Sequence, residues 1–204
     1  MQRKCPDNHL VGIHLVHVSK DFGALYEVKL LSPQDKADKE KVRLFRPAEG
    51  PKENLESVTV EVVPKGGQKW IGIFMGNYDS PPSANVMMTA PNERDVCIVI
   101  RGIGYIVDVL NPDQWQEVRC HPILDIYSIR EKGVLIFKDF TRLTAYDLSG
   151  FRWRTRHISW DGITVEEVNE ERISGTVYEA PTASQIKFSV EIDTGEIAGA
   201  TWHP

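Results

Sequence analysis

A recurring unit restricts the fold of this sequence more than any other feature. Each copy has a short apolar strand, a turn built on glycine or proline, and a defined position three residues after the turn. The turns are 45, 38 and 45 residues apart and lie at Gly67, Pro112, Gly150 and Gly195. The defined position is occupied by Trp70, Trp115, Trp153 and Ala198. A period of about 40 residues is typical of four-stranded propeller blades.

The rest of the chain also indicates β-structure. About sixteen short segments between turn residues are rich in β-branched and aromatic side chains. The apolar run from Val134 to Phe140 predicts a strand that is buried on both faces. No segment keeps the 3.6-residue apolar period of a helix over three turns, so we expect little helix. These patterns predict an all-β, antiparallel fold, either propeller-like with repeats of about 40 residues or a two-sheet β-sandwich.

Length and composition predict one domain. A chain of 204 residues with 41% hydrophobic and 26% charged residues can bury a core without disulfides. The longest turn-rich loop, residues 76–85, contains Pro81-Pro82 and is where a boundary would fall if the chain had two domains. We therefore expect a single all-β domain over residues 1–204.

Charge and hydropathy argue against two classes of partner. The net charge of −5 disfavours nucleic acid and an anionic membrane surface. No apolar run approaches the roughly 18 residues of a membrane span, and no apolar leader follows the basic N-terminus. The three cysteines, Cys5, Cys97 and Cys120, are an odd number without close spacing. This spacing favours reduced thiols and a cytoplasmic location.

An arginine stripe after the Ser149-Gly150 turn is the most suggestive candidate site. Strict strand alternation places Arg152, Arg154 and Arg156 on one face and Phe151, Trp153, Thr155 and His157 on the other. Three guanidinium groups on one face could bind a phosphate or carboxylate. The ligand-binding residues expected here are Arg152, Arg154, Arg156, His157 and Trp160.

The alternative is that the arginines form cross-strand ion pairs on a solvated face. Asp161-Gly162 reads as a hairpin turn, and residues 163–168 read as the return strand. Glu166 or Glu167 would then lie opposite the arginines. The sequence leaves both interpretations open.

The histidines and the absent motifs predict neither a metal nor a cofactor. His14 and His17 are three residues apart on a strand-like segment, so they point to opposite faces, and His9 adds no convergent ligand. The chain contains no P-loop, no dinucleotide fingerprint opening a helix and no nucleophile elbow. We expect no metal site and no cofactor.

The cysteines and the one aspartic-protease-like triplet have simple structural interpretations. Cys97 lies in an apolar strand, where cysteine is usually a small buried hydrophobe. The Cys120-His121 pair is adjacent in sequence, which does not place a base beside a nucleophile. Asp193-Thr194-Gly195 has no second copy to share a proton, and a hairpin turn explains it. Catalytic residues therefore stay unassigned.

Several segments between residues 70 and 199 combine glycines, aromatic residues and turn residues: 70–74 (WIGIF), 102–108 (GIGYIVD), 140–146 (FTRLTAY), 150–155 (GFRWRT), 159–162 (SWDG) and 188–195. In these segments the chain resembles a family of uncharacterised bacterial β-rich proteins. The first 65 residues do not share this resemblance. It implies a bacterial β-rich protein and no particular activity.

Taken together, these features favour a non-enzymatic, cytoplasmic binding or interaction module. Its partner would be another protein or a second copy of the chain, and not nucleic acid or a membrane. The alternative is a hydrolase or binding protein for an anionic small molecule held by the arginine stripe. The missing catalytic motifs favour the first interpretation.

Overall fold

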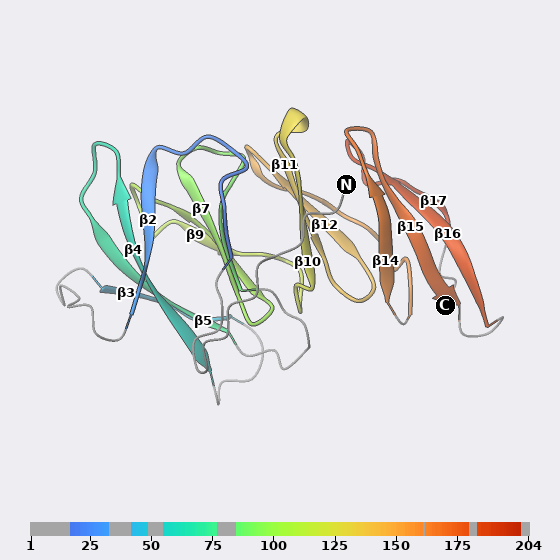
Figure 1. Cartoon of the computed structure of the whole chain (residues 1–204), viewed down its shortest axis with the longest axis horizontal. Coiled ribbons are helices and arrows are strands. Elements are labelled where there is room, and N and C mark those ends of the chain that lie inside the picture. The colour runs from blue at the N-terminus through green and yellow to red at the C-terminus, as the bar shows by residue number, and fades with distance from the viewer. Residues whose placement is uncertain are drawn as a thin grey trace.

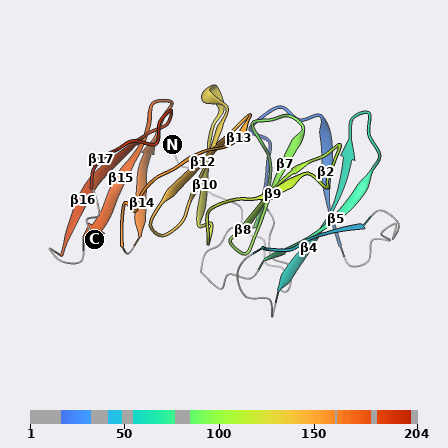
Figure 2. The ribbon, with the colours of Figure 1, turned by 180° about the vertical axis from the view of Figure 1, so that it is seen from behind.

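The strands form four small sheets that stand side by side in a row (Figure 1). This computed structural model describes residues 17–32, 42–48, 55–76, 85–160, 162–179 and 183–200. The view from behind shows the same order of sheets along the row (Figure 2). The fold is therefore all-β and propeller-like, and the two-sheet sandwich does not apply.

The first two sheets each contain one parallel pair in an otherwise antiparallel arrangement. The first sheet has the order β2 (Tyr26–Leu31), β4 (Glu56–Pro64), β5 (Trp70–Gly76), β3 (Val42–Phe45), and β3 is parallel to β5. The second sheet has the order β1 (His17–Ser19), β6 (Val86–Thr89), β7 (Asp95–Ile100), β8 (Ile103–Asp108), β9 (Trp115–Glu117), and β1 is parallel to β6.

The third and fourth sheets are simple antiparallel meanders. The third contains β10 (Asp125–Ile129), β11 (Val134–Lys138), β12 (Leu143–Asp147) and β13 (Gly150–Arg154), with a short 3-10 turn at Arg130–Lys132. The fourth contains β14 (Ile163–Val168), β15 (Arg172–Glu179), β16 (Ser184–Glu191) and β17 (Ile197–Gly199). That 3-10 turn is the only helical element in the described part of the chain.

The core lies between the sheets, because strand side chains alternate between the two neighbours. In β7, Val96 and Ile98 pack towards the first sheet, whereas Cys97 and Val99 pack towards the third. The predicted doubly buried strand behaves in the same way. Leu135 and Phe137 of β11 join the cluster with the second sheet, and Val134 and Ile136 join the cluster with the fourth. Three interfaces therefore hold the row together.

The recurring unit of the sequence is the last hairpin of each sheet: β4–β5, β8–β9, β12–β13 and β16–β17. In two sheets its tryptophan bonds to the next sheet: Trp70 Nε1 donates to Val109 O at 2.9 Å, and Trp153 Nε1 donates to Ile192 O at 2.8 Å. Trp115 differs, because it pairs with Val107 and packs back against Phe45 of the first sheet. The period thus marks sheet-to-sheet contacts.

The hairpin predicted around Asp161-Gly162 is wrong. β13 is the last strand of the third sheet and β14 is the first strand of the fourth, so the two do not pair. The expected boundary loop, residues 76–85, lies mostly outside the described residues, as do His9 and His14.

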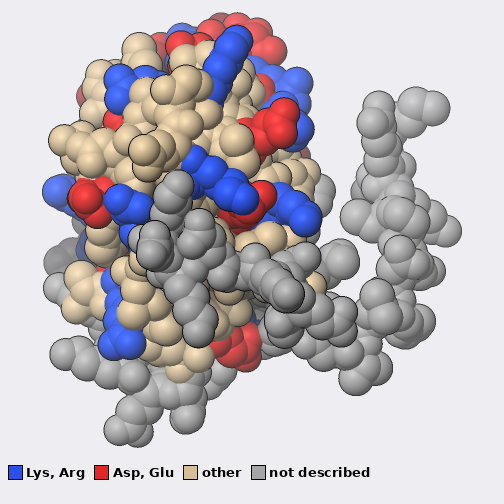
Figure 3. Space-filling view, turned by 90° about the vertical axis from the view of Figure 1, so that its left-hand side faces the viewer, with Lys and Arg blue, Asp and Glu red and all other residues tan. Residues whose placement is uncertain are grey.

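The two ends of the row differ in polarity. The fourth sheet presents polar side chains outward along β15 and β16, among them Thr176 and Lys187, which lie opposite each other. The outer face of the first sheet carries the exposed Leu44 and Val63 beside an ion pair between Lys69 and Glu61, 2.9 Å apart. Figure 3 shows this end, where charged side chains of both signs surround uncharged ones. A polar outer sheet is typical of the terminal repeat of an array.

Candidate binding surface

The turn between β11 and β12, residues 139–142, forms the base of a candidate binding surface. The side chain of Asp139 is buried, and its Oδ1 accepts hydrogen bonds from Thr141 N at 2.7 Å, Arg142 N at 2.7 Å and Thr141 Oγ1 at 3.2 Å. Aspartate closes turns in this way because its short side chain reaches the backbone N–H groups two and three residues on. The turn holds Phe140 with 43% of its surface exposed.

The segment after β13, residues 155–160, lies against this turn. Thr155 N donates to Leu143 O at 2.9 Å, and Ile158 N donates to Thr141 O at 2.8 Å. The Thr155 Oγ1 accepts a further bond from Leu143 N at 3.0 Å. These bonds fix the backbone that leads to Trp160, which is 63% exposed. The hydrogen bond between Ile158 and Thr141 thus joins two segments that each carry an exposed aromatic residue. Phe140 comes directly before Thr141, and Trp160 comes two residues after Ile158.

A β-bulge separates the arginines that the sequence pattern places together. β12 and β13 pair through Ala145 with Trp153 and through Tyr146 with Phe151, so Arg152 is an extra residue between the two pairs. The bulge also puts Phe151 and Trp153 on different faces. Phe151 meets Tyr146 edge to face, at a ring-centroid distance of 5.8 Å, whereas Trp153 packs towards the fourth sheet. The expected strict alternation is therefore wrong.

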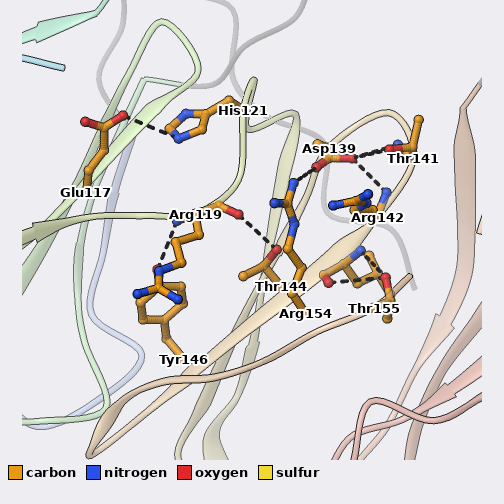
Figure 4. Close-up of polar contacts among 11 residues, drawn as sticks. Glu117, Arg119, His121, Asp139, Thr141, Arg142, Thr144, Tyr146, Arg154 and Thr155 are labelled. Atoms are coloured by element: carbon orange, nitrogen blue, oxygen red, sulfur yellow. Dashed lines mark hydrogen bonds and ion pairs between the residues drawn. The ribbon is translucent and has the colours of Figure 1, made fainter. Parts of the chain in front are cut away.

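Each arginine of the stripe has its own surroundings. Arg152 Nη2 lies 3.1 Å from Asp193 Oδ1 of the fourth sheet. Arg154 Nη2 lies 3.3 Å from Asp139 Oδ2, and Figure 4 shows the Arg154 side chain pointing toward the 139–142 turn. Arg156 is exposed and has no ion pair with any described residue. The three side chains do not converge on one ligand.

The glutamates proposed as partners of the stripe bond elsewhere. Glu166 Oε1 accepts from Thr176 Oγ1 at 3.0 Å, and Glu167 Oε1 accepts from Asn169 Nδ2 at 3.2 Å. Both glutamates lie on the fourth sheet, which does not pair with β13. The expected cross-strand pairing of Glu166 or Glu167 with the arginines is wrong, and aspartates from turns take that role.

Of the five predicted site residues, Arg156, His157 and Trp160 lie on the segment beside the 139–142 turn. Arg154, at the end of β13, reaches the turn through Asp139, whereas Arg152 does not. Sequence reasoning missed Phe140 and Arg142, which the turn adds to the same surface. The available signal was Asp139 itself, because aspartate side chains commonly close turns. We call Phe140, Arg142, Arg154, Arg156, His157 and Trp160 the aromatic–arginine surface. A ligand-binding role for these residues stays a prediction.

The electrostatics of this surface are positive. Partial burial lowers the pKa of His157, the charges of Arg142 and Arg154 lower it further, and Asp139 offsets part of the effect. Arg142 lies beside Asp139 and Arg154 in Figure 4, and its Nε is buried without an acceptor among the described residues. Two guanidinium groups and one carboxylate act on the imidazole, so positive charge is in excess around it.

A second polar group lies nearby, between the second and third sheets. His121 Nε2 is 3.3 Å from Glu117 Oε1, and Tyr146 Oη accepts a hydrogen bond from Arg119 N at 2.9 Å (Figure 4). The Arg119 guanidinium covers the Phe151 ring, 4.7 Å from its centroid. These contacts connect the two sheets. They leave the Arg119 side chain stacked on an aromatic ring.

The cysteines are poor nucleophiles. Burial raises the pKa of the Cys97 thiol to about 12. Burial also raises the pKa of Cys120, and the neighbouring Asp139 raises it further. Both thiols are buried and unpaired. A nucleophilic cysteine needs a lowered pKa and access to substrate, and neither thiol meets these conditions.

The described residues contain no cluster of three or more histidine, cysteine, aspartate or glutamate side chains arranged to hold a metal ion. Within the same residues, no helix has the length and apolar character needed to cross a membrane.

Comparisons with known proteins find similar solved structures but assign the chain to no family. No protein-family model matches the chain, and no curated protein is significantly similar to it. The crystal structure of the N-terminal domain of Nup159 is similar over 92% of this chain and 54% of its own length, with 12% identity and a TM-score of 0.38.

Two further solved structures are similar to the same degree. One chain in the structure of S. cerevisiae Dbp5 bound to Nup159, Gle1, IP6 and ADP is 12% identical to this chain, with a TM-score of 0.38. The match covers 90% of this chain and 53% of that chain. The WD40 domain of SCAP from fission yeast has 12% identity, covers 86% and 48%, and has a TM-score of 0.33. The chain spans about half the length of the structures it matches.

Proposed function

We propose that this protein is a non-enzymatic binding module that engages another protein through the aromatic–arginine surface. One observation carries the proposal: the exposed Phe140 and Trp160 flank arginines on two segments that are bonded to each other. Tryptophan, other aromatic residues and arginine are the side chains most enriched where interfaces gain their binding energy. A single exposed aromatic residue is ordinary, but two beside three arginines are a recognisable interface composition.

The backing of the surface also supports binding. Asp139 fixes the turn, and Thr155 fixes the adjoining segment through bonds to Leu143 in both directions. A surface held in place before binding loses little conformational entropy when a partner arrives. The buried, raised-pKa thiols support a binding role over an enzyme that uses a cysteine nucleophile.

Two further expectations belong to the same proposal. We propose a cytoplasmic location, because Cys97 and Cys120 are unpaired thiols. We also propose that the chain is a single domain, because Trp70 and Phe74 of the first sheet share a cluster with Ile98 and Tyr105 of the second.

Site-specific photo-cross-linking in cells tests the proposal. We expect Trp160→p-benzoyl-Phe to give a discrete adduct with a second protein. We expect Tyr178→p-benzoyl-Phe to give no such adduct, although Tyr178 of β15 is also 44% exposed. Adding Phe140→Ala to the position-160 probe should abolish the adduct. Identical products from both positions, or none from position 160, would refute a partner at this surface.

A further inference from the structure

The arginines of the aromatic–arginine surface point to the class of group that this surface binds. We propose that the aromatic–arginine surface takes a carboxylate carried on an acidic segment of the partner, held chiefly by Arg142 and Arg154. The inference rests on the proposed function for the identity of the partner as a protein. It adds the chemistry of recognition.

Arg142 makes no ion pair with a described residue, and of its side-chain nitrogens only Nε is buried without an acceptor. Its backbone N–H bonds to Asp139, which holds the residue in place without satisfying the guanidinium. The buried Nε faces the protein, so the two Nη groups of Arg142 are the donors that a partner's carboxylate can reach.

The arginines elsewhere in the described chain contrast with this surface. Most have a carboxylate within ion-pair distance: Arg43–Asp113, Arg94–Asp108, Arg101–Glu56, Arg130–Asp21, Arg152–Asp193 and Arg172–Glu171. At the surface, Arg154 pairs with Asp139, whereas Arg142 and Arg156 make no ion pair with a described residue. A local positive excess in a chain of net charge −5 favours an anionic partner group.

The geometry suits a carboxylate on a peptide. Arg154 gives one Nη to Asp139, and a guanidinium has five N–H donors in a planar fork, so donors remain for a second oxyanion. Arg142 lies beside it, as Figure 4 shows. Phe140 and Trp160 offer apolar contact for the side chains next to the anionic group, which a free ion lacks.

Titration of the intact protein with hexaglutamate, followed by NMR, tests the inference. We expect saturable shifts of the Arg142 and Arg154 Nε–Hε resonances. We also expect the pKa of His157 to rise, because a bound carboxylate offsets the arginine charges that lower it. R142Q should weaken binding at least about tenfold, because it removes charge-assisted hydrogen bonds. R142K, which keeps the charge and loses the fork, should weaken it too.

R172Q is the matched control, and R156Q is a second test of the surface. Arg172 is exposed and lies on the fourth sheet, so R172Q should bind hexaglutamate like the unchanged protein. R156Q changes an exposed side chain of the surface and should weaken binding without affecting folding. Equal binding by R142Q, R142K and the unchanged protein would overturn the inference. Shifts with inorganic phosphate and none with hexaglutamate would overturn it as well, because the site would then take a free ion.

The two proposals can fail separately. An adduct at position 160 that persists unchanged in R142Q overturns the carboxylate inference and leaves the protein partner in place. Arg142-dependent binding of hexaglutamate without any adduct at position 160 supports carboxylate recognition and counts against a partner protein in the cell.

Discussion

The indole of Trp153 donates a 2.8 Å hydrogen bond to the carbonyl oxygen of Ile192, a residue 39 positions further along the chain and one sheet away. Trp70 and Val109 repeat this relationship at the same 39-residue interval, with a bond of 2.9 Å. Each bond joins the last hairpin of one sheet to the last hairpin of the next. The hairpins therefore hold neighbouring sheets in register.

Trp153→Phe should destabilise the protein by about 1–3 kcal/mol, because it removes the indole N–H donor. The buried Ile192 carbonyl oxygen then loses this hydrogen bond. The free energy of unfolding in urea measures the effect. Trp115→Phe is the matched control, since Trp115 is 38% exposed and packs back against Phe45. Equal losses in the two variants would show that the hydrogen bond is not the cause.

Gly195→Ala should destabilise the protein by at least about 2 kcal/mol, because it combines backbone strain with a clash. The φ angle of Gly195 is +74°, and a Cβ there would lie 2.7 Å from Cδ2 of Trp153. Gly133→Ala is the control: its φ is +62°, but a Cβ would meet nothing within 4 Å. We expect it to cost about 1 kcal/mol from strain alone. Thermal unfolding of both variants checks the difference.

Asp139→Ala should cost about 2–4 kcal/mol, because the turn loses the acceptor for Thr141 N and Arg142 N together with the partner of Arg154. Asp139→Asn keeps the acceptor and loses the charge, so it should cost less. Urea unfolding ranks the two variants. Asp113→Asn, which alters an ion pair whose carboxylate side chain is 80% exposed, should change stability by less than about 1 kcal/mol. Equal effects of the two Asp139 variants would contradict this account.

Asp21 connects β1 to the third sheet and should make stability depend on pH. Burial raises its pKa, but hydrogen bonds from Ser19, Arg130 and Ser128 outweigh burial, so the pKa is lowered from 3.8. A carboxyl with a lowered folded-state pKa stabilises above its unfolded pKa, and this stabilisation is lost as pH falls. Asp21→Asn should therefore be less stable than the unchanged protein at pH 7. The difference should shrink between about pH 5 and pH 3.

The pKa of Asp95 is raised rather than lowered, so replacing Asp95 should change stability in the direction opposite to Asp21→Asn. Burial raises its pKa, and the nearby Asp108 raises it further. A raised folded-state pKa means that ionised Asp95 opposes folding at neutral pH, so Asp95→Asn should be more stable than the unchanged protein at pH 7. This gain should also shrink as pH falls. Parallel pH profiles for both variants would contradict the two assignments.

Local patterns were sufficient to predict the fold class. The repeat spacing located all four last hairpins, and the predicted strand at Ile163–Val168 has the bounds that the structure gives it. Two pairings could not be predicted from local pattern. β1 pairs with β6, and β3 pairs with β5, across long stretches of chain and in parallel. Nothing in a three- or four-residue strand specifies so distant a partner.

The candidate site was predicted in part, and the failure has a physical cause. A single extra residue reverses the faces of a strand, so the bulge at Arg152 disrupted a pattern that depended on strict alternation. Arg142 was not predicted, because its position beside Asp139 and Arg154 depends on the packing of the turn. Asp139 could have been recognised as a turn-closing residue and would have drawn attention to its neighbours.

The parallel strand β1 has a consequence for the order in which this chain acquires structure during synthesis. Residues 17–19 leave the ribosome well before their partners at 86–88, and residues 42–45 precede their partners at 71–74. The third and fourth sheets, by contrast, pair each strand with the next one made. Strands β1 and β3 therefore have unpaired edges until β6 and β5 emerge, whereas each strand of the third and fourth sheets can pair as soon as the next one is made.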